Sequence, residues 1–373
     1  MLQRLSFHQN PHLYISRHQA PWLHIRAYRE VLLSKPFPLL RRILLHLQQL
    51  LMPRHLTQHF ARIDTNQIPS AIRKAWLQIE LAGLAKDNES GVPSKAQRKE
   101  AKEAVEQRCQ TEAATGKYRK MQQFPLLWDT RKELLYFGGS LGTAAGHCIE
   151  LLERSFGIEL HHHGAGAVAQ AWSTEQSSSL NDLTASSFVS NQSHGSYAWQ
   201  SEFSQAPDFL GNEFLMWLWW TLENESDAIL LPDDSTVTVM LAKTLVLECP
   251  IGESGKETIS ADSPVKLPEA LQAIRAGKLP RKSGMTIIRD GRQFDLVLQA
   301  ETFGISGAKI HLHDDEDLDD VDRIEAIRLL SDSVDQLFLA FCGLRSSKSW
   351  SKLQQQITQW LHSTAEGIQQ TAA

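Results

Sequence analysis

Two stretches of this chain carry residues that could bind a metal ion or a phosphate, and neither has the required spacing. His161, His162 and His163 are adjacent, so their side chains cannot all converge on one ion, and no carboxylate falls at helical spacing beside them. The segment GESGKET resembles a phosphate-binding loop, but Pro250 stands where that loop has glycine, and Glu257 stands where it has Ser or Thr. We therefore predict neither a metal centre nor a nucleotide-hydrolysing loop.

The acidic run HLHDDEDLDD, residues 311–320, is the third candidate. Nuclease chemistry commonly gathers carboxylates from separate elements around two metal ions. A continuous acidic run before a helix is more typical of a solvated helix N-terminus, which the helix dipole favours. A metal-dependent exonuclease using Asp314, Asp315 and Asp317 stays open as an alternative. We predict no catalytic residue and no cofactor, because the chain has no G-x-S-x-G, H-E-x-x-H or paired-cysteine pattern.

Basic residues give the stronger signal. The formal net charge of −5 hides a segregation, because residues 1–154 hold 23 Lys and Arg against 13 Asp and Glu, whereas residues 155–242 hold 11 acids and no Lys or Arg. Such a separation of charge gives information about binding partners, and a basic section favours binding to a polyanion. Lys95, Lys99 and Lys102 gather on one side of an expected helix, and residues 117–120 read KYRK.

The elements that must position these cations follow from the sequence pattern. A strand near residues 62–68 precedes a helix over 69–84, and Ser94 is a good N-cap for a second, basic helix. Residues 125–160 predict strand, turn, strand, helix and strand. From Asp208 onward we expect further elements: an aromatic helix over 210–223, a strand over 236–249, a helix over 268–278, a hairpin turned at Asp290 and Gly291, and helices near 319–344 and 349–362.

These elements predict a mixed α+β chain of several domains, with a basic helical arm, β-hairpins and C-terminal helices. Residues 1–60 form an atypical basic segment without a clear strand or helix pattern, and residues 61–160 a central α/β region. Residues 161–207 turn to Ser, Gln, Ala and Gly, which is typical of a linker or insertion. Residues 208–373 form a second α/β domain.

Trp217, Trp219 and Trp220 could stack on bases, but their helix is apolar nearly all round, which favours a core or a subunit interface. A protein-protein adaptor using this helix is the third functional alternative. The four cysteines are scattered and indicate buried thiols. Because we see neither a secretory signal nor an apolar run long enough to span a bilayer, we expect a cytoplasmic protein without membrane contact.

Five segments in this order and spacing resemble the RdgC family of recombination-associated proteins: IDTNQIP, SGVPSKAQRKEA, ATGKYRKMQQFPLLWD, FLGNEFLMWLWW and IRAGKLPRK. The resemblance covers about residues 61–160 and 208–362. It implies a nucleoid-associated protein that binds double-stranded DNA with little sequence preference, forms a ring-shaped homodimer, and modulates the access of a recombinase to DNA.

The resemblance also implies which residues would contact DNA. The segment before PLLWD matches the family's DNA-gripping finger, with Tyr118 as the aromatic fingertip, and IRAGKLPRK matches a later basic loop. The contacts it implies are Lys95, Lys99, Lys102, Lys117, Tyr118, Arg119, Lys120, Arg275, Lys278, Arg281 and Lys282. Residues 1 to about 58 do not resemble the family's strand-rich start, and a shifted reading frame is one explanation that the coding DNA would test. Compact members lack the segment 161–207.

Overall fold

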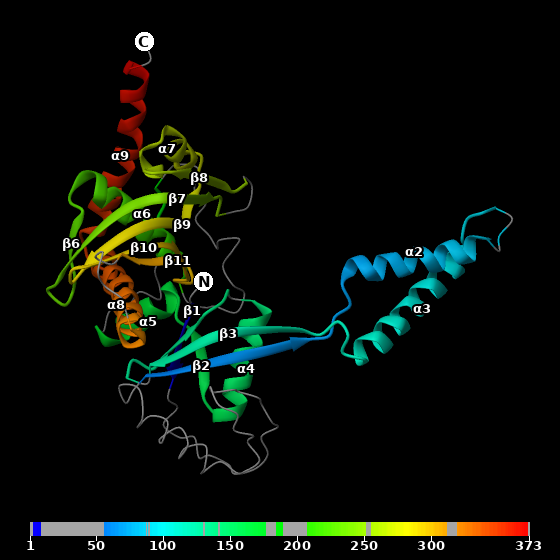
Figure 1. Ribbon diagram of the computed structural model, residues 1–373. Helices are drawn as coiled ribbons and strands as arrows, with labels where there is room; N and C mark the ends of the chain where they lie inside the picture. Colours follow the sequence, from blue (N-terminus) through cyan, green and yellow to red (C-terminus); the bar gives the residue numbers. More distant parts are fainter. Residues whose placement is uncertain are drawn as a thin grey trace. The chain divides into compact units, whose positions relative to one another are not determined.

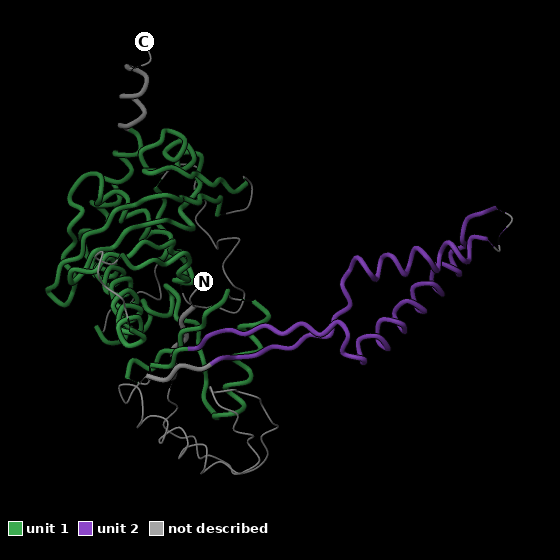
Figure 2. Tube along the Cα trace, viewed as in Figure 1, with its two compact units in different colours: residues 1–20, 36–57, 127–373 green, residues 21–35, 58–126 purple. Residues whose placement is uncertain are grey.

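The computed structural model describes residues 3–8, 56–86, 88, 90–129, 131–140, 142–176, 184–188, 207–250, 255–311 and 319–371. Most of the atypical segment 1–60 lies outside these residues. The chain divides into two compact units (Figure 2). We call residues 58–126 the arm and residues 127–373 the body, so the predicted central region 61–160 is shared between them at Leu126 and Leu127.

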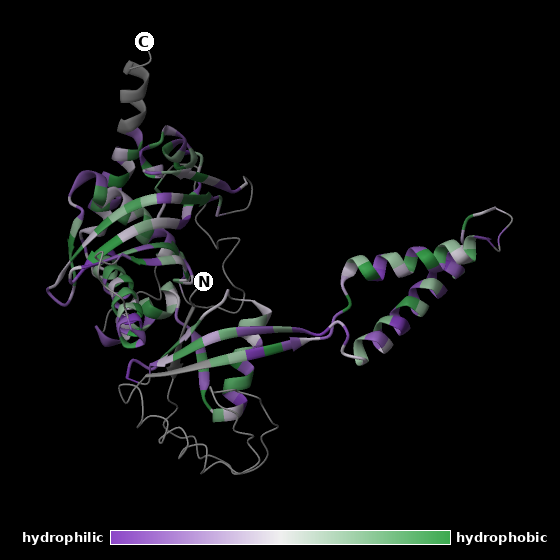
Figure 3. Cartoon of the chain, in the orientation of Figure 1, coloured by the Kyte–Doolittle hydropathy of each residue, from purple (hydrophilic) through white to green (hydrophobic). Residues whose placement is uncertain are grey.

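The arm consists of two strands and a helical hairpin (Figure 1). Strand β2 (Leu56–Thr65) leads into helix α2 (Ser70–Lys86), and helix α3 (Lys95–Ala114) leads into strand β3 (Lys120–Asp129). The two helices pack along their length, with Ala101, Val105 and Cys109 of α3 buried. Figure 3 shows hydrophilic and hydrophobic residues alternating along both helices, as expected for a pair with one face packed and the other solvated.

The first sheet of the chain has the strand order β2-β3-β4-β1-β5. Strand β4 (Leu134–Phe137) is buried throughout, and helix α4 (Thr143–Phe156) leads into β5 (Glu159–His162). The strand, turn, strand, helix and strand predicted for residues 125–160 are therefore confirmed. Strand β1 (Gln3–His8) pairs antiparallel with both β4 and β5, although no strand pattern was recognisable in residues 1–60.

The second sheet belongs to the body and has the order β11-β10-β9-β7-β6, with β8 paired to β7. Its antiparallel strands are β6 (Ala228–Leu230), β7 (Thr236–Glu248), β8 (Glu257–Ala261), β9 (Leu279–Arg289), β10 (Arg292–Gln299) and β11 (Ile305–His311). The predicted hairpin turn is confirmed: Asp290 has φ 51° and Gly291 has φ 73°, the left-handed pair that a two-residue type I′ turn requires.

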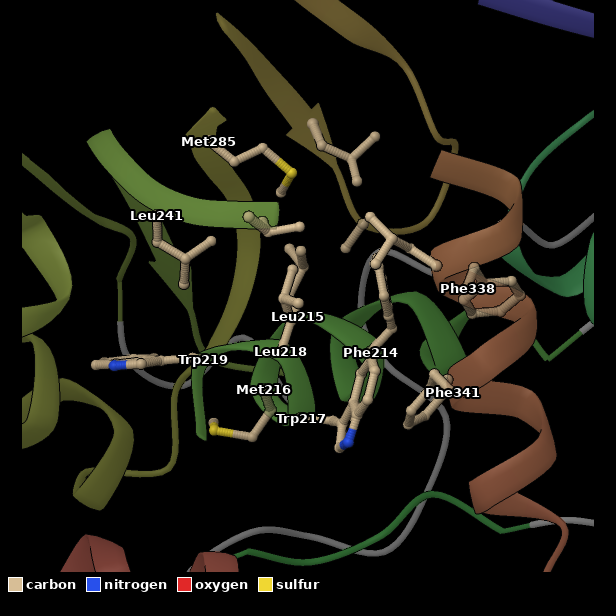
Figure 4. Close-up of a cluster of buried hydrophobic side chains, with 14 of the residues drawn as sticks. Phe214, Leu215, Met216, Trp217, Leu218, Trp219, Leu241, Met285, Phe338 and Phe341 are labelled. Atoms are coloured by element: carbon tan, nitrogen blue, oxygen red, sulfur yellow. The ribbon is translucent and has the colours of Figure 1, made fainter. Parts of the chain in front are cut away.

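Beside α4, the described part of the body contains the helices α5 (Ala165–Glu175), α6 (Phe209–Asn224), α7 (Pro268–Arg275), α8 (Asp320–Arg345) and α9 (Trp350–Thr371). Helix α6 is the centre of the core, with all three tryptophans of its run at most 5% exposed. Figure 4 shows its side chains near those of the sheet and of α8, among them Phe214, Leu218, Leu241, Met285 and Phe338. The prediction of a core helix rather than a base-stacking surface is confirmed.

The segment 161–207, assigned to a linker or insertion by its composition, contains an ordered and packed part. Residues 165–175 form helix α5, with Ala165 and Ala169 fully buried. Further along, the Phe188 side chain is fully buried in the main core cluster. Small residues favour a linker by composition, but here they allow close packing. A Cβ added at Gly211 of α6 would lie 3.0 Å from the Ala165 Cβ and 1.9 Å from the Ala300 carbonyl oxygen, so a larger residue would not fit at position 211. Residues 177–183 and 189–206 lie outside the described residues.

The chain is thus a mixed α+β protein built on antiparallel sheets, as predicted. No helix in the described part of the chain combines the length and the apolar character needed to cross a membrane.

Candidate nucleic-acid interface

Helix α3 begins where the sequence predicts, at a capping box. Ser94 Oγ accepts a hydrogen bond from the Gln97 backbone N–H at 3.3 Å, and Gln97 Oε1 accepts one from the Ser94 backbone N–H at 2.8 Å. Two of the helix's otherwise unpaired donors are satisfied in this way. Gly116 follows the helix with φ 73°, the left-handed conformation that ends many helices.

The three predicted lysines of α3 are exposed. Lys99 Nζ lies 3.6 Å from a carboxylate oxygen of Glu103, but both side chains are largely in solvent, so this pair is weak. No ion pair of Lys95 or Lys102 is seen within the described residues. With a rise of about 1.5 Å per residue, Lys95 and Lys102 are about 10 Å apart along the helix axis. This distance is about three base-pair rises of B-DNA.

Residues 117–119 lie between α3 and β3, and Lys120 is the first residue of β3, at the connection between the helical hairpin and the two strands of the arm. Lys117 and Lys120 are exposed, and Lys117 Nζ lies 5.9 Å from the centre of the half-buried Tyr118 ring. Arg119 is held by Asp64 at the end of β2. We call residues 62–64 and 117–121 the neck. The resemblance implies a DNA-gripping finger at these residues, and the structure shows a short connection tied to the neighbouring strand.

The second predicted basic group, IRAGKLPRK, is not an exposed loop. It comprises the end of α7 and the start of β9, and three of its four cations have internal partners. Arg275 Nε donates to the Leu361 carbonyl at 2.7 Å, and Lys278, only 5% exposed, pairs with Glu257. Arg281 pairs with two carboxylates, those of Glu248 and Glu301, each at 3.0 Å. Lys282 is partly exposed on β9, and within the described residues its side chain has neither an ion pair nor a hydrogen bond.

The internal pairing of these cations has a physical reason. The sheet places Glu248 on β7 and Glu301 after β10 beside the Arg281 guanidinium, and these nearby carboxylates raise the Arg281 pKa against the opposing effect of burial. A guanidinium held this way is already fully engaged in charge-assisted hydrogen bonds. Arg275, Lys278 and Arg281 therefore stabilise the body and do not form an exposed basic loop.

The residues considered for metal chemistry do not form a centre in the described part of the chain. Among those residues no group of three or more His, Cys, Asp or Glu side chains is placed to hold an ion. His161 and His162 are successive residues of β5, so they point to opposite faces of the sheet, and His163 Nε2 lies 3.3 Å from Asp335. Asp314, Asp315 and Asp317 lie outside the described residues.

Two residues of the neck were missed by sequence reasoning. Asp64 belongs to the segment IDTNQIP and Arg62 is the residue before it, and the pattern of these residues predicts only a strand. Asp64 lies 55 positions before Arg119 in the chain, and only the folding of the hairpin brings them together.

Sequence comparisons give no further guidance to this site. No family model matches the chain, and no curated protein matches it at a significant level.

Proposed function

We propose that this chain binds double-stranded DNA without sequence preference and that the arm supplies the main contact surface. The observation that carries the proposal is the set of exposed lysines along α3 and at the neck: Lys95, Lys99, Lys102, Lys117 and Lys120. Lysines in such positions contact phosphates, which are the same in every sequence, rather than base edges. The chain as a whole would act as a homodimer that modulates recombinase access at the nucleoid, as the resemblance to RdgC proteins implies.

Charge within the arm supports this assignment. Residues 58–126 hold twelve Lys and Arg against eight Asp and Glu, in a chain whose net charge is −5. Exposed cations release counterions from DNA when they neutralise phosphates, so binding should weaken steeply with salt. The body's basic residues at 275–281 are engaged internally and contribute little to this effect.

The test compares two variants that lose the same charge from different places. One is K95A/K99A/K102A in the arm, and the control is K256A/K348A/K352A, three exposed lysines of the body. Affinity for a fluorescent duplex is measured by anisotropy over a range of salt, with two unrelated duplex sequences. We expect the arm variant to bind both duplexes more weakly, with a log-log salt slope shallower by up to about 3, and the control to resemble the wild type. Equal effects in both variants would contradict an interface on the arm.

A further inference from the structure

The neck contains a carboxylate shared by two arginines. Arg62 donates from Nε to Asp64 Oδ1 at 2.8 Å and from Nη2 to Asp64 Oδ2 at 2.9 Å. Arg119 donates from Nε to Asp64 Oδ2 at 3.0 Å, and its Nη2 also contacts that oxygen. One carboxylate thereby connects the end of β2 with the residue before β3 and joins the two connections to the helical hairpin.

Within the part of the chain that the structure describes, each guanidinium has one nitrogen without a hydrogen-bond partner. Both arginines use Nε and Nη2 toward Asp64, and within the described residues neither Nη1 has a hydrogen-bond partner. The Arg62 Nη2 additionally lies 2.8 Å from Met121 Sδ, which fixes that guanidinium further. A guanidinium has five N–H donors in a rigid plane, so the edge opposite a carboxylate remains able to bind a phosphate.

The cluster is accessible and carries a net positive charge. The Arg119 side chain is 51% exposed and that of Asp64 27% exposed, so both groups reach solvent. Hydrogen bonds from Arg62 and then from Arg119 lower the pKa of Asp64 to about 2. The carboxylate is therefore ionised at every pH at which DNA is bound, and it neutralises one of the two arginines.

We propose that Asp64 is a positioning residue of the DNA-binding surface, which holds Arg62 and Arg119 together so that their free Nη1 groups bind a backbone phosphate. This inference rests on the proposed function of the arm, and it adds Arg62 to the contact residues. Lys117 and Lys120 flank the same place in the chain, so the neck would present several cations to one stretch of backbone.

Simple electrostatics predicts the opposite effect of removing Asp64. A carboxylate close to a DNA phosphate repels it, so its neutralisation should strengthen binding. A positioning role predicts weaker binding, because without Asp64 the two long arginine side chains lose conformational entropy when they are ordered on DNA. The sign of the change distinguishes the two effects.

The experiment uses the full-length chain, a fluorescent duplex and a range of salt. D64N removes the charge with little change of shape, and D64E restores the carboxylate. The matched control is E103Q, which removes a carboxylate that is 3.6 Å from Lys99 but is 69% exposed and holds nothing in place. We expect D64N to weaken binding about three- to tenfold, E103Q to strengthen it slightly, and D64E to recover most of the loss.

The salt slope separates positioning from a merely structural role. Loss of two positioned arginines should make the log-log slope of D64N shallower by up to about 2. Loss of folded protein would lower the binding-competent fraction and leave the slope of the remaining protein unchanged. Tighter binding by D64N, or an unchanged slope, would overturn the inference while leaving the proposed function standing. No salt-dependent binding by the wild type would overturn both.

Discussion

A buried ion pair in the body gives the sharpest stability prediction. Glu213 of α6 is fully buried, and its Oε2 accepts a hydrogen bond from Arg345 Nε of α8 at 2.6 Å. The same pair holds the segment 184–188, because the Ser186 backbone N–H donates to Glu213 Oε1 at 2.6 Å and Arg345 Nη2 donates to the Thr184 carbonyl at 2.9 Å. Arg345 also lies over the Trp350 ring at 4.9 Å.

The replacement R345M leaves Glu213 as a buried charge without its cation. Breaking one side of such a pair costs about 3 to 5 kcal/mol, whereas an exposed helix pair contributes less than about 1 kcal/mol. The matched control is therefore R323A on the same helix, where Arg323 lies 3.6 Å from Asp320 and both side chains are mostly exposed. We expect R345M to lower the urea midpoint strongly and R323A to leave it nearly unchanged.

The effect of R345M should depend on pH in a defined direction. Burial already raises the pKa of Glu213, and Arg345 opposes that rise. Without Arg345 the folded protein binds a proton to Glu213 more readily than the unfolded chain does, so stability increases as pH falls from 7 toward the ordinary Glu pKa.

Urea unfolding, followed by tryptophan fluorescence at pH 7 and pH 5.5, measures both effects. We expect the deficit of R345M relative to the wild type to shrink at the lower pH. The double variant E213Q/R345M, which has neither charge, should be more stable than R345M alone. A deficit below about 1 kcal/mol at pH 7, or one that grows on acidification, would refute this account of the pair.

Three further predictions concern the core, the arm and the neck. W217A should cost about 3 to 5 kcal/mol of unfolding free energy in urea, because this side chain is 3% exposed in the core; melting like that of the wild type would contradict its place there. S94A should cost about 1 kcal/mol and reduce α3 helicity by circular dichroism, since it removes half of the capping box, and an unchanged spectrum would argue against the cap. Because the Asp64 pKa is about 2, against 3.8 for an unperturbed carboxyl group, the stability that the neck gains from it should persist above pH 4 and be lost as pH falls toward 2. NMR titration of the Asp64 carboxyl carbon should show this, with a higher pKa in R119A; equal values in both proteins would contradict the contact.

Features set by neighbouring residues were predictable from the sequence. The capping box at Ser94 and the turn at Asp290 and Gly291 depend on residues within a few positions, and both are found. The composition of α6 indicated its burial, because a helix that is apolar on every side cannot face water.

Features set by distant partners were not predictable. Composition marked residues 161–207 as a linker or insertion, yet Ala165 in this segment packs closely against Gly211 of α6. The cations at 275–281 were expected to contact DNA because of the resemblance of IRAGKLPRK to a basic loop. The carboxylates that engage Lys278 and Arg281, those of Glu257, Glu248 and Glu301, lie elsewhere in the sequence, so these ion pairs could not be predicted from it. At the neck, the pairing of Asp64 with Arg119 exists only once the hairpin closes.

Binding of duplex DNA by the arm through phosphate contacts is the function proposed for this chain. The most direct test is the anisotropy of a labelled duplex titrated with the full chain between about 50 and 200 mM salt, repeated with K95A/K99A/K102A. Counterion release predicts that the wild type loses affinity steeply over this range, equally for unrelated sequences, and that the variant shows a slope shallower by up to about 3. Wild-type binding that is absent at low salt, or a variant whose affinity and slope equal those of the wild type, would contradict the claim.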